Sequence, residues 1–382
     1  MSIGEALATD DPRRVHVAWD SIQQRLEETE GDLYVLFTQD SPVPRPPRER
    51  RAAVEEAMAL ATAAVDEEVY GRDVSPSPYG PVVWIDYITS EDDLRTWLNV
   101  FAASLEGAGW SGRVEAHPQA WFPEGLPWTP RPTAFLAYRL DTPDSDPSVR
   151  TRRTVAPWTT VALCRDAIEW GRFEGAQAYL QTGGSQILFD PSRADEILVR
   201  ITDFAGAGIT FLRQEPFRIC QMNLWARAEP AGQCVYQLED ERLDWKAIVQ
   251  ELTQLLIRHA DTLDLAIVRL AQAGAHSWRH LKSPPPPQVS EGEVVANRHL
   301  WDRFVPDAHG IQLLTEAHLA RAGNLDAWDV QRLTPDRYLV QAKDLRPWFA
   351  ENETNPDILT AARQDFRDML LTPEIIEAHG DL

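Results

Sequence analysis

The sequence predicts an α+β protein with two related mixed-sheet α/β modules and a small C-terminal α/β module after a polyproline linker. Three observations lead to this prediction. Short apolar runs alternate with amphipathic helical patterns that begin at capping residues. The motif Gly-Ala-Gly follows a helical pattern twice, at 107–109 and at 206–208. Residues 284–287 are all proline, which favours an extended spacer.

The first predicted module covers residues 1–141. A helical pattern at 15–30 precedes an apolar run at 33–37, which favours a buried strand. The segment 41–48 is rich in proline, which removes backbone donors and fixes φ, so neither a helix nor a central strand is expected there. The remaining predicted elements are a helix at 49–68, a strand at 82–88, a helix capped by Thr89 or Ser90 that ends at 107–109, and strands at 112–117 and 133–140.

The second predicted module covers residues 157–282 and has a similar order of elements. These are a helix at 159–171, strands on both sides of Gly183-Gly184, a helix from Asp190-Pro191 to 206–208, strands at 209–212, 217–227 and 234–238, and a helical stretch at 242–273 with a break near 261–262. Because both modules show strand, capped helix, Gly-Ala-Gly and strand, the second is predicted to be a diverged repeat of the first. The alternative is that any strand–helix–strand unit shares these signals.

A linker at 283–290 separates these modules from an acidic C-terminal module at 291–382. Helices at 293–304 and 315–322, a hairpin at 328–343 and a last helix from Asn355-Pro356 are predicted there. The module holds 9 Lys+Arg against 17 Asp+Glu, a net charge of −8. This charge argues against a DNA-reading role, which needs a basic surface.

The whole chain is strongly acidic. Its 382 residues hold 37 Lys+Arg and 59 Asp+Glu, a formal net charge of −22. Such a field repels phosphate backbones and anionic lipids, so we expect no nucleic-acid partner and no membrane partner. It attracts basic proteins. Solubility or adaptation to salt is the alternative explanation of the charge.

Targeting and redox signals favour a soluble protein of the cytoplasm. Residues 1–11 lack the basic and apolar regions of a signal peptide, and no run approaches the roughly 18 apolar residues of a membrane span. The cysteines Cys164, Cys220 and Cys234 are odd in number and widely spaced, which favours packing roles in a reducing compartment. The near absence of lysine indicates a bacterial origin.

Few residues are candidates for catalysis. Glu115 and His117 lie two positions apart on a predicted strand, so they share a face and form a candidate acid–base pair. Asp86 interrupts an otherwise apolar strand, where burial would perturb its pKa. The Gly183-Gly184 turn does not continue into a phosphate-loop pattern, and a G-x-S-x-G nucleophile elbow is absent from the sequence. No cofactor is predicted.

His276 and His280 are candidate metal ligands, because side chains four residues apart share one face of a helix. A carboxylate would have to complete the site. Ser277 stands where the helix of a metalloprotease carries its general-base Glu. The pattern favours the alternative, a helix end beside an exposed linker, so no metal site is predicted.

Aromatic residues in proline-containing loops are candidate binding residues. Trp121, Phe122, Trp128 and Trp158 lie in such loops. Exposed aromatic side chains supply much of the affinity at protein interfaces. The alternative is that these loops fold back on their own domain.

One principal hypothesis and two alternatives follow. The principal hypothesis is a non-catalytic intracellular protein, immunity-like or an adaptor, whose acidic surface binds a basic protein partner. The first alternative is a hydrolase that uses Asp86, Glu115 and His117, or a metal-dependent enzyme that uses His276 and His280. The second alternative attributes the acidity to salt adaptation or solubility alone.

Overall fold

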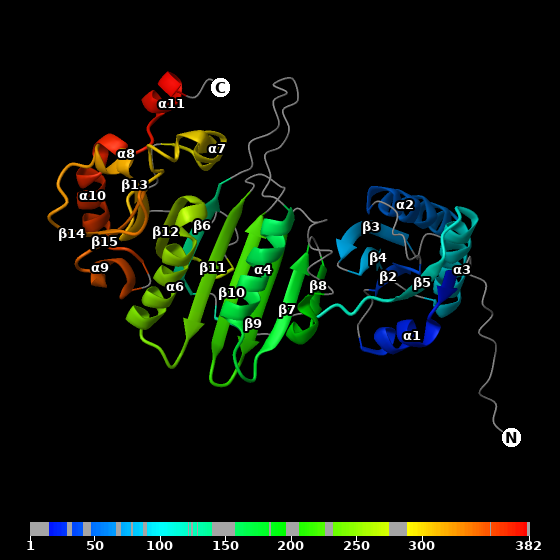
Figure 1. Ribbon diagram of the computed structural model, residues 1–382. Coiled ribbons are helices and arrows are strands. Elements are labelled where there is room, and N and C mark those ends of the chain that lie inside the picture. Colours follow the sequence, from blue (N-terminus) through cyan, green and yellow to red (C-terminus); the bar gives the residue numbers. More distant parts are fainter. Residues whose placement is uncertain are drawn as a thin grey trace. The chain divides into compact units, whose positions relative to one another are not determined.

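The computed structural model shows two compact units, whose elements are labelled in Figure 1. The first unit comprises Met1–Trp121 and Gln181–Leu188, and the second comprises Phe122–Leu180 and Phe189–Leu382. Helices and two sheets confirm the predicted α+β class. The structure describes residues 15–28, 33–40, 47–65, 70–77, 79–86, 90–120, 122–123, 125–127, 129–139, 157–182, 185–195, 206–225, 232–274, 289–351 and 353–379.

The first unit is built on a mixed five-stranded sheet. Its elements are β1 (Val15–Val17), α1 (Trp19–Glu28), β2 (Leu33–Gln39), α2 (Pro47–Ala63), β3 (Tyr70–Ser77), β4 (Gly80–Asp86), α3 (Glu91–Gly107) and β5 (Gly112–Ala116). The strand order is β1-β5-β2-β4-β3, with β1 parallel to β5 and the other pairs antiparallel. From β2 to β5 the chain therefore follows the β-α-β-β-α-β connection of the split β-α-β, or ferredoxin-like, motif.

Helices α2 and α3 pack against each other and enclose the core of this unit with the sheet. Alternation along β2 places Leu33, Val35 and Phe37 in that core. Helix α3 adds apolar side chains at helical spacing, among them Leu94 and Trp97. Of the two predicted capping residues, Ser90 caps α3, because its side chain accepts a hydrogen bond from the Asp93 amide at 3.3 Å.

The other sheet has the order β14-β15-β13-β12-β6-β11-β10-β9-β7-β8, and all of its strands except β8 and the last two residues of β7 belong to the second unit. The elements before residue 280 are β6 (Arg131–Tyr138), α4 (Pro157–Gly171), β7 (Gln177–Thr182), β8 (Ser185–Leu188), η1 (Pro191–Arg193), β9 (Gly206–Arg213), β10 (Arg218–Trp225), β11 (Gln233–Asp240), α6 (Trp245–His259), η2 (Ala260–Thr262) and β12 (Leu263–Ala271). Those after it are α7 (Glu291–Ala296), η4 (Arg298–Leu300), β13 (Ile311–Thr315), α8 (Glu316–Leu319), β14 (Trp328–Arg332), β15 (Arg337–Ala342), α9 (Arg346–Phe349), α10 (Pro356–Asp365), η5 (Arg367–Met369) and α11 (Pro373–His379).

The β-α-β-β-α-β order of elements found in the first unit occurs a second time in the second unit. The elements β6, α4, β10, β11, α6 and β12 follow the order β-α-β-β-α-β, and their strands lie in the order β12-β6-β11-β10. Helices α4 and α6 lie on one face of this sheet (Figure 1). Strands β7, β8 and β9 are inserted between α4 and β10. In this alignment α3 corresponds to α6, whereas the sequence comparison aligned α3 with the segment after Asp190-Pro191.

Three predicted helical segments contain strands in the structure, and the first of these strands is β1 at Val15–Val17. Residues 206–208, expected to end a helix, begin β9, which pairs with β10 along its whole length. Residues 263–271, expected to continue a helix, form β12, where apolar side chains on both faces suit a central strand between β6 and β13. The expected helix break near 261–262 is where α6 gives way to η2.

Strands β1, β3 and β13 were not predicted. The hairpin of β14 and β15 and the strands on both sides of residues 183–184 were predicted correctly. Strand β6, placed by the sequence in the first module, lies between β11 and β12, and β13 pairs with β12. The bounds 1–141, 157–282 and 291–382 thus differ from the two compact units, and as folding domains they stay predictions. Residues 283–288 of the expected linker lie outside the described residues.

Candidate functional site

One face of the first sheet brings together polar and aromatic side chains from four strands. The face turned away from the Val35 and Val83 core carries two cross-strand rows, which we call the outer face. The register of β5, β2, β4 and β3 aligns the members of each row. The first row is His117, Tyr34, Trp84 and Asp73, and the second is Glu115, Leu36, Val82 and Ser75.

Tyr34 and Trp84 form a stacked pair on the outer face. Their ring centroids lie 6.0 Å apart with an interplanar angle of 9°. Both side chains are half-buried, and Asp73, opposite Trp84 on β3, is exposed. The guanidinium carbon of Arg72 lies 5.1 Å from the centroid of the Trp84 ring. This corner of the face therefore presents aromatic surface with a cation already on it.

Glu115 and His117 both lie on the outer face, as their spacing predicted, but in different surroundings. Glu115 is half-buried and forms an ion pair with Arg113 at 3.1 Å. His117 is 1% exposed. Burial and the nearby charge of Arg25 lower the pKa of His117 to about 4, although a hydrogen bond with Gln119 acts in the opposite direction. The imidazole is therefore neutral at pH 7.

The other predicted site residues are only partly described. Asp86 is the last residue of β4, and its side chain lies outside the description. Phe122 is half-buried against the Tyr179 ring, with centroids 4.8 Å apart, which is the arrangement of a loop that packs on its own unit. Trp158 lies in α4, whose first side chains are not described. Trp121, Trp128, His276 and His280 lie outside the described residues.

The first unit carries more than half of the net charge in about a third of the chain. Residues 1–121 and 181–188 hold 22 Asp+Glu and 10 Arg, a net charge of −12 out of −22. Its described surface exposes ten carboxylates and four arginines. The exposed carboxylates are those of Asp20, Glu27, Asp40, Glu49, Glu55, Glu56, Asp73, Glu91, Asp92 and Glu106. The acidity is thus spread over the unit rather than gathered in one cavity.

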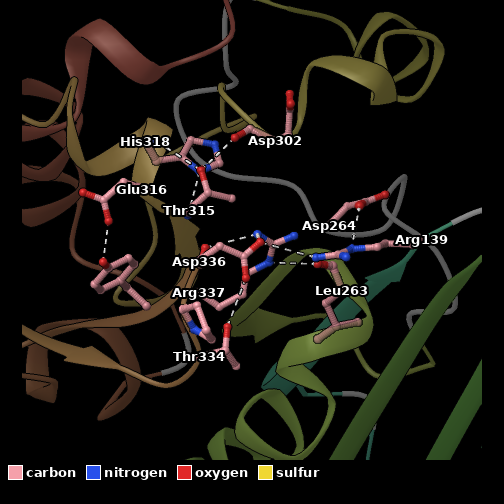
Figure 2. Close-up of polar contacts among 12 residues, drawn as sticks. Arg139, Leu263, Asp264, Asp302, Thr315, Glu316, His318, Thr334, Asp336 and Arg337 are labelled. Carbon is pink, nitrogen blue, oxygen red and sulfur yellow. Dashed lines mark hydrogen bonds and ion pairs between the residues drawn. The ribbon is translucent and has the colours of Figure 1, made fainter.

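A network of arginines and aspartates lies in the second unit, where β12 begins (Figure 2). Arg337 is buried, and its Nε donates to the Leu263 carbonyl at 3.1 Å while its Nη1 pairs with Asp336 at 2.8 Å. Arg139 lies 3.8 Å from the Asp264 carboxylate and 3.7 Å from that of Asp336. Burial raises the pKa of Asp264, and the neighbouring arginines oppose that shift. The network ties β15 and β6 to β12.

A second, more deeply buried cluster lies toward the other end of β12. Asp307 is 3% exposed and accepts two hydrogen bonds from Arg363, at 2.7 and 2.8 Å. Burial alone would raise the pKa of Asp307, but the hydrogen bonds and the positive charge of Arg363 lower it. Burial and the charge of Arg269 lower the pKa of His309 to about 3. The cluster is a buried ion pair beside a neutral histidine.

The cysteines have the packing role that their positions predicted. All three are buried and free. Burial raises the pKa of the Cys164 and Cys220 thiols to about 12 and raises that of Cys234 further, so these thiols stay protonated at pH 7. Within the described ranges, no group of three or more His, Cys, Asp or Glu side chains is placed to hold a metal ion. None of the described helices is long and apolar enough to cross a membrane.

Comparisons of the chain with models of protein families, with curated proteins and with solved structures found no match. The candidate site is the acidic first unit, with the aromatic corner of its outer face as the most specific feature. The sequence patterns pointed to Glu115 and His117 but not to Tyr34 and Trp84, which lie in the strands predicted at 33–37 and 82–88. The signal for Tyr34 was its alternation with the buried Leu33 and Val35 along one strand.

Proposed function

We propose that the protein is a non-catalytic binding protein whose first unit associates with a basic protein partner, as an immunity protein or an adaptor would. The supporting observation is the charge of that unit, −12 in one third of the chain. A field of this kind speeds the diffusional encounter with a basic protein and repels nucleic acids and anionic lipids. A partner in the cytoplasm is part of this proposal, in keeping with three free, buried cysteines.

The second unit supports the proposal through what its buried polar groups do. Asp307 is engaged by Arg363, and Arg337 by Asp336 and a backbone carbonyl. His318 is bound to the backbone of Thr315. These groups stabilise the unit through contacts within the chain, which fits a scaffold that carries the binding unit.

Affinity capture tests the proposal. The full chain is immobilised and exposed to native lysate at low salt, and bound proteins are identified by mass spectrometry. We expect a stoichiometric partner with a basic isoelectric point, whose association rate falls as ionic strength rises.

Charge-reversal variants assign the association to the first unit. Glu56→Lys, Asp92→Lys and Glu106→Lys, combined in one protein, reverse exposed carboxylates of that unit that have no ion-pair partner among the described residues. We expect the association rate with the captured partner to fall about ten-fold. The control combines Glu174→Lys, Glu353→Lys and Glu377→Lys, which make the same charge change on the second unit. An equal loss in both proteins, or no partner at low salt, would contradict the proposal.

A further inference from the structure

A β-bulge directs Arg72 onto the aromatic corner of the outer face. The pairing of β3 with β4 shifts between Gly71 and Asp73, so Arg72 is the extra residue on β3. Bulges re-aim side chains, and here the guanidinium of Arg72 lies over the Trp84 ring at 5.1 Å. The Trp84 ring is therefore shown to accept a guanidinium in this setting, with the carboxylate of Asp73 beside it on the same face.

The surroundings of this corner favour a cation over an anion. Asp73 is exposed, and its carboxylate accepts hydrogen bonds from the Val74 amide at 2.8 Å and the Ser75 hydroxyl at 3.4 Å, both in its own segment. The second carboxylate of the face, that of Glu115, lies in the adjoining row with its Arg113 partner. The unit as a whole has a net charge of −12.

We propose that this corner, formed by Tyr34, Trp84 and Asp73, is where the partner inserts an arginine side chain, which takes the place of Arg72 over the Trp84 ring. The inference rests on the proposed function and names the chemistry of the contact. Arginine is preferred to lysine because its planar guanidinium stacks on an aromatic ring while its edge pairs with a carboxylate. Arg72 acts as an intramolecular competitor for the same ring.

Two labelled peptides of equal charge, nona-arginine and nona-lysine, separate this contact from general attraction. Fluorescence anisotropy at low salt gives a dissociation constant for each peptide with the full chain. General attraction affects both constants alike, so the ratio of the lysine constant to the arginine constant reports stacking. We expect a ratio of about two to five for the wild type. We expect Trp84→Leu to reduce the ratio to about one.

The variant Arg72→Ala gives the sharper test, because it removes the guanidinium from the face of the Trp84 ring and should strengthen binding of nona-arginine. We expect it to raise the ratio further, about two-fold or more. Arg51→Ala is the matched control: it also removes one exposed arginine of the first unit, one that pairs with Glu55 on α2. This control is expected to tighten both peptides equally and to leave the ratio unchanged. Because the Arg72 side chain is exposed, we expect Arg72→Ala to fold, so the test remains valid if Trp84→Leu does not fold.

The outcomes distinguish the inference from the proposed function. The arginine site is overturned if the wild-type ratio is one, or if Arg72→Ala and Arg51→Ala give the same ratio. Neither result affects the proposal that a basic partner binds the first unit. If neither peptide binds the wild type at low salt, both the arginine site and the acidic binding unit are overturned. A raised ratio in Arg72→Ala with a lost preference in Trp84→Leu supports the site.

Discussion

His318 is fully buried, and its Nδ1 accepts a hydrogen bond from the Thr315 amide at 3.0 Å (Figure 2). In return, the Thr315 hydroxyl accepts from the His318 amide at 3.3 Å and donates to the Asp302 carbonyl at 2.7 Å. The pair forms the capping box of α8. Burial, together with the charges of Arg337 and Arg321, lowers the pKa of His318 to about 4. The imidazole is a structural acceptor that must stay neutral.

This residue predicts how stability depends on pH. The folded-state pKa of His318 lies below the unfolded-state value of about 6.5, so the unfolded state takes up the proton first as pH falls. The contribution of His318 is complete above pH 6.5 and is lost as pH falls toward 4. We expect this group alone to lower the free energy of unfolding by up to about 1.4 kcal/mol per pH unit in that window. Urea unfolding followed by circular dichroism at pH 7, 6 and 5 measures it.

The variant His318→Gln is expected to be less stable at pH 7 and to show a shallower loss of stability between pH 6.5 and 4. The control, His16→Gln, changes an exposed histidine on β1 and is expected to keep the wild-type slope. Equal slopes in the wild type and in both variants would show that His318 is not held neutral by the fold.

At the scale of elements, a glycine is required where the backbone of a neighbouring strand lies too close for a Cβ atom. Gly112 begins β5 with a φ of 157°, and a Cβ there would lie 2.1 Å from the Thr38 carbonyl oxygen on the neighbouring strand. Gly107, the last residue of α3, has no heavy atom within 4 Å of a Cβ. The two glycines lie on either side of the same short connection, but only Gly112 is required for the pairing of β5 with β2.

These glycines give a matched pair of substitutions. We expect Gly112→Ala to lower the free energy of unfolding by more than about 1 kcal/mol, because the methyl group collides with backbone at a φ that alanine rarely adopts. We expect Gly107→Ala to leave stability unchanged or to raise it by up to about 1 kcal/mol, since alanine favours the helix. Urea unfolding of both variants measures the difference, and similar values would contradict the assignment.

The sequence pattern also left the type of one element, helix or strand, undecided. Helix α6 and strand β12 form one continuous apolar pattern, and Leu263–Ala271 is apolar enough for either structure. Pairing with β6 on one side and β13 on the other decided for the strand. By contrast, the cap at Ser90 and the hairpin of β14 and β15 depend on neighbours a few residues away, and both were predicted correctly.

At the scale of the whole molecule, each unit has buried side chains of its own and contains a β-α-β-β-α-β connection of its own. We therefore expect calorimetry of the full chain to resolve two unfolding transitions. Ser90→Ala removes the cap of α3, worth about 1 kcal/mol, and should lower only the transition of the first unit. Asp307→Asn breaks a buried ion pair and should lower only the other, by about 3–5 kcal/mol. A single transition that both variants lower would show one cooperative unit.

The amino-acid sequence by itself determined the fold class, the helix starts at Ser90 and Asn355, the C-terminal hairpin and the charge of −22. Each of these depends on composition or on residues close together in the chain. Only the tertiary structure decided that β6 lies between β11 and β12, that residues 263–271 are a strand, and that Tyr34, Trp84 and Asp73 meet on one face. The physical reason is that strand pairing and burial are set by partners distant in sequence, whereas caps and turns are set by local hydrogen bonds.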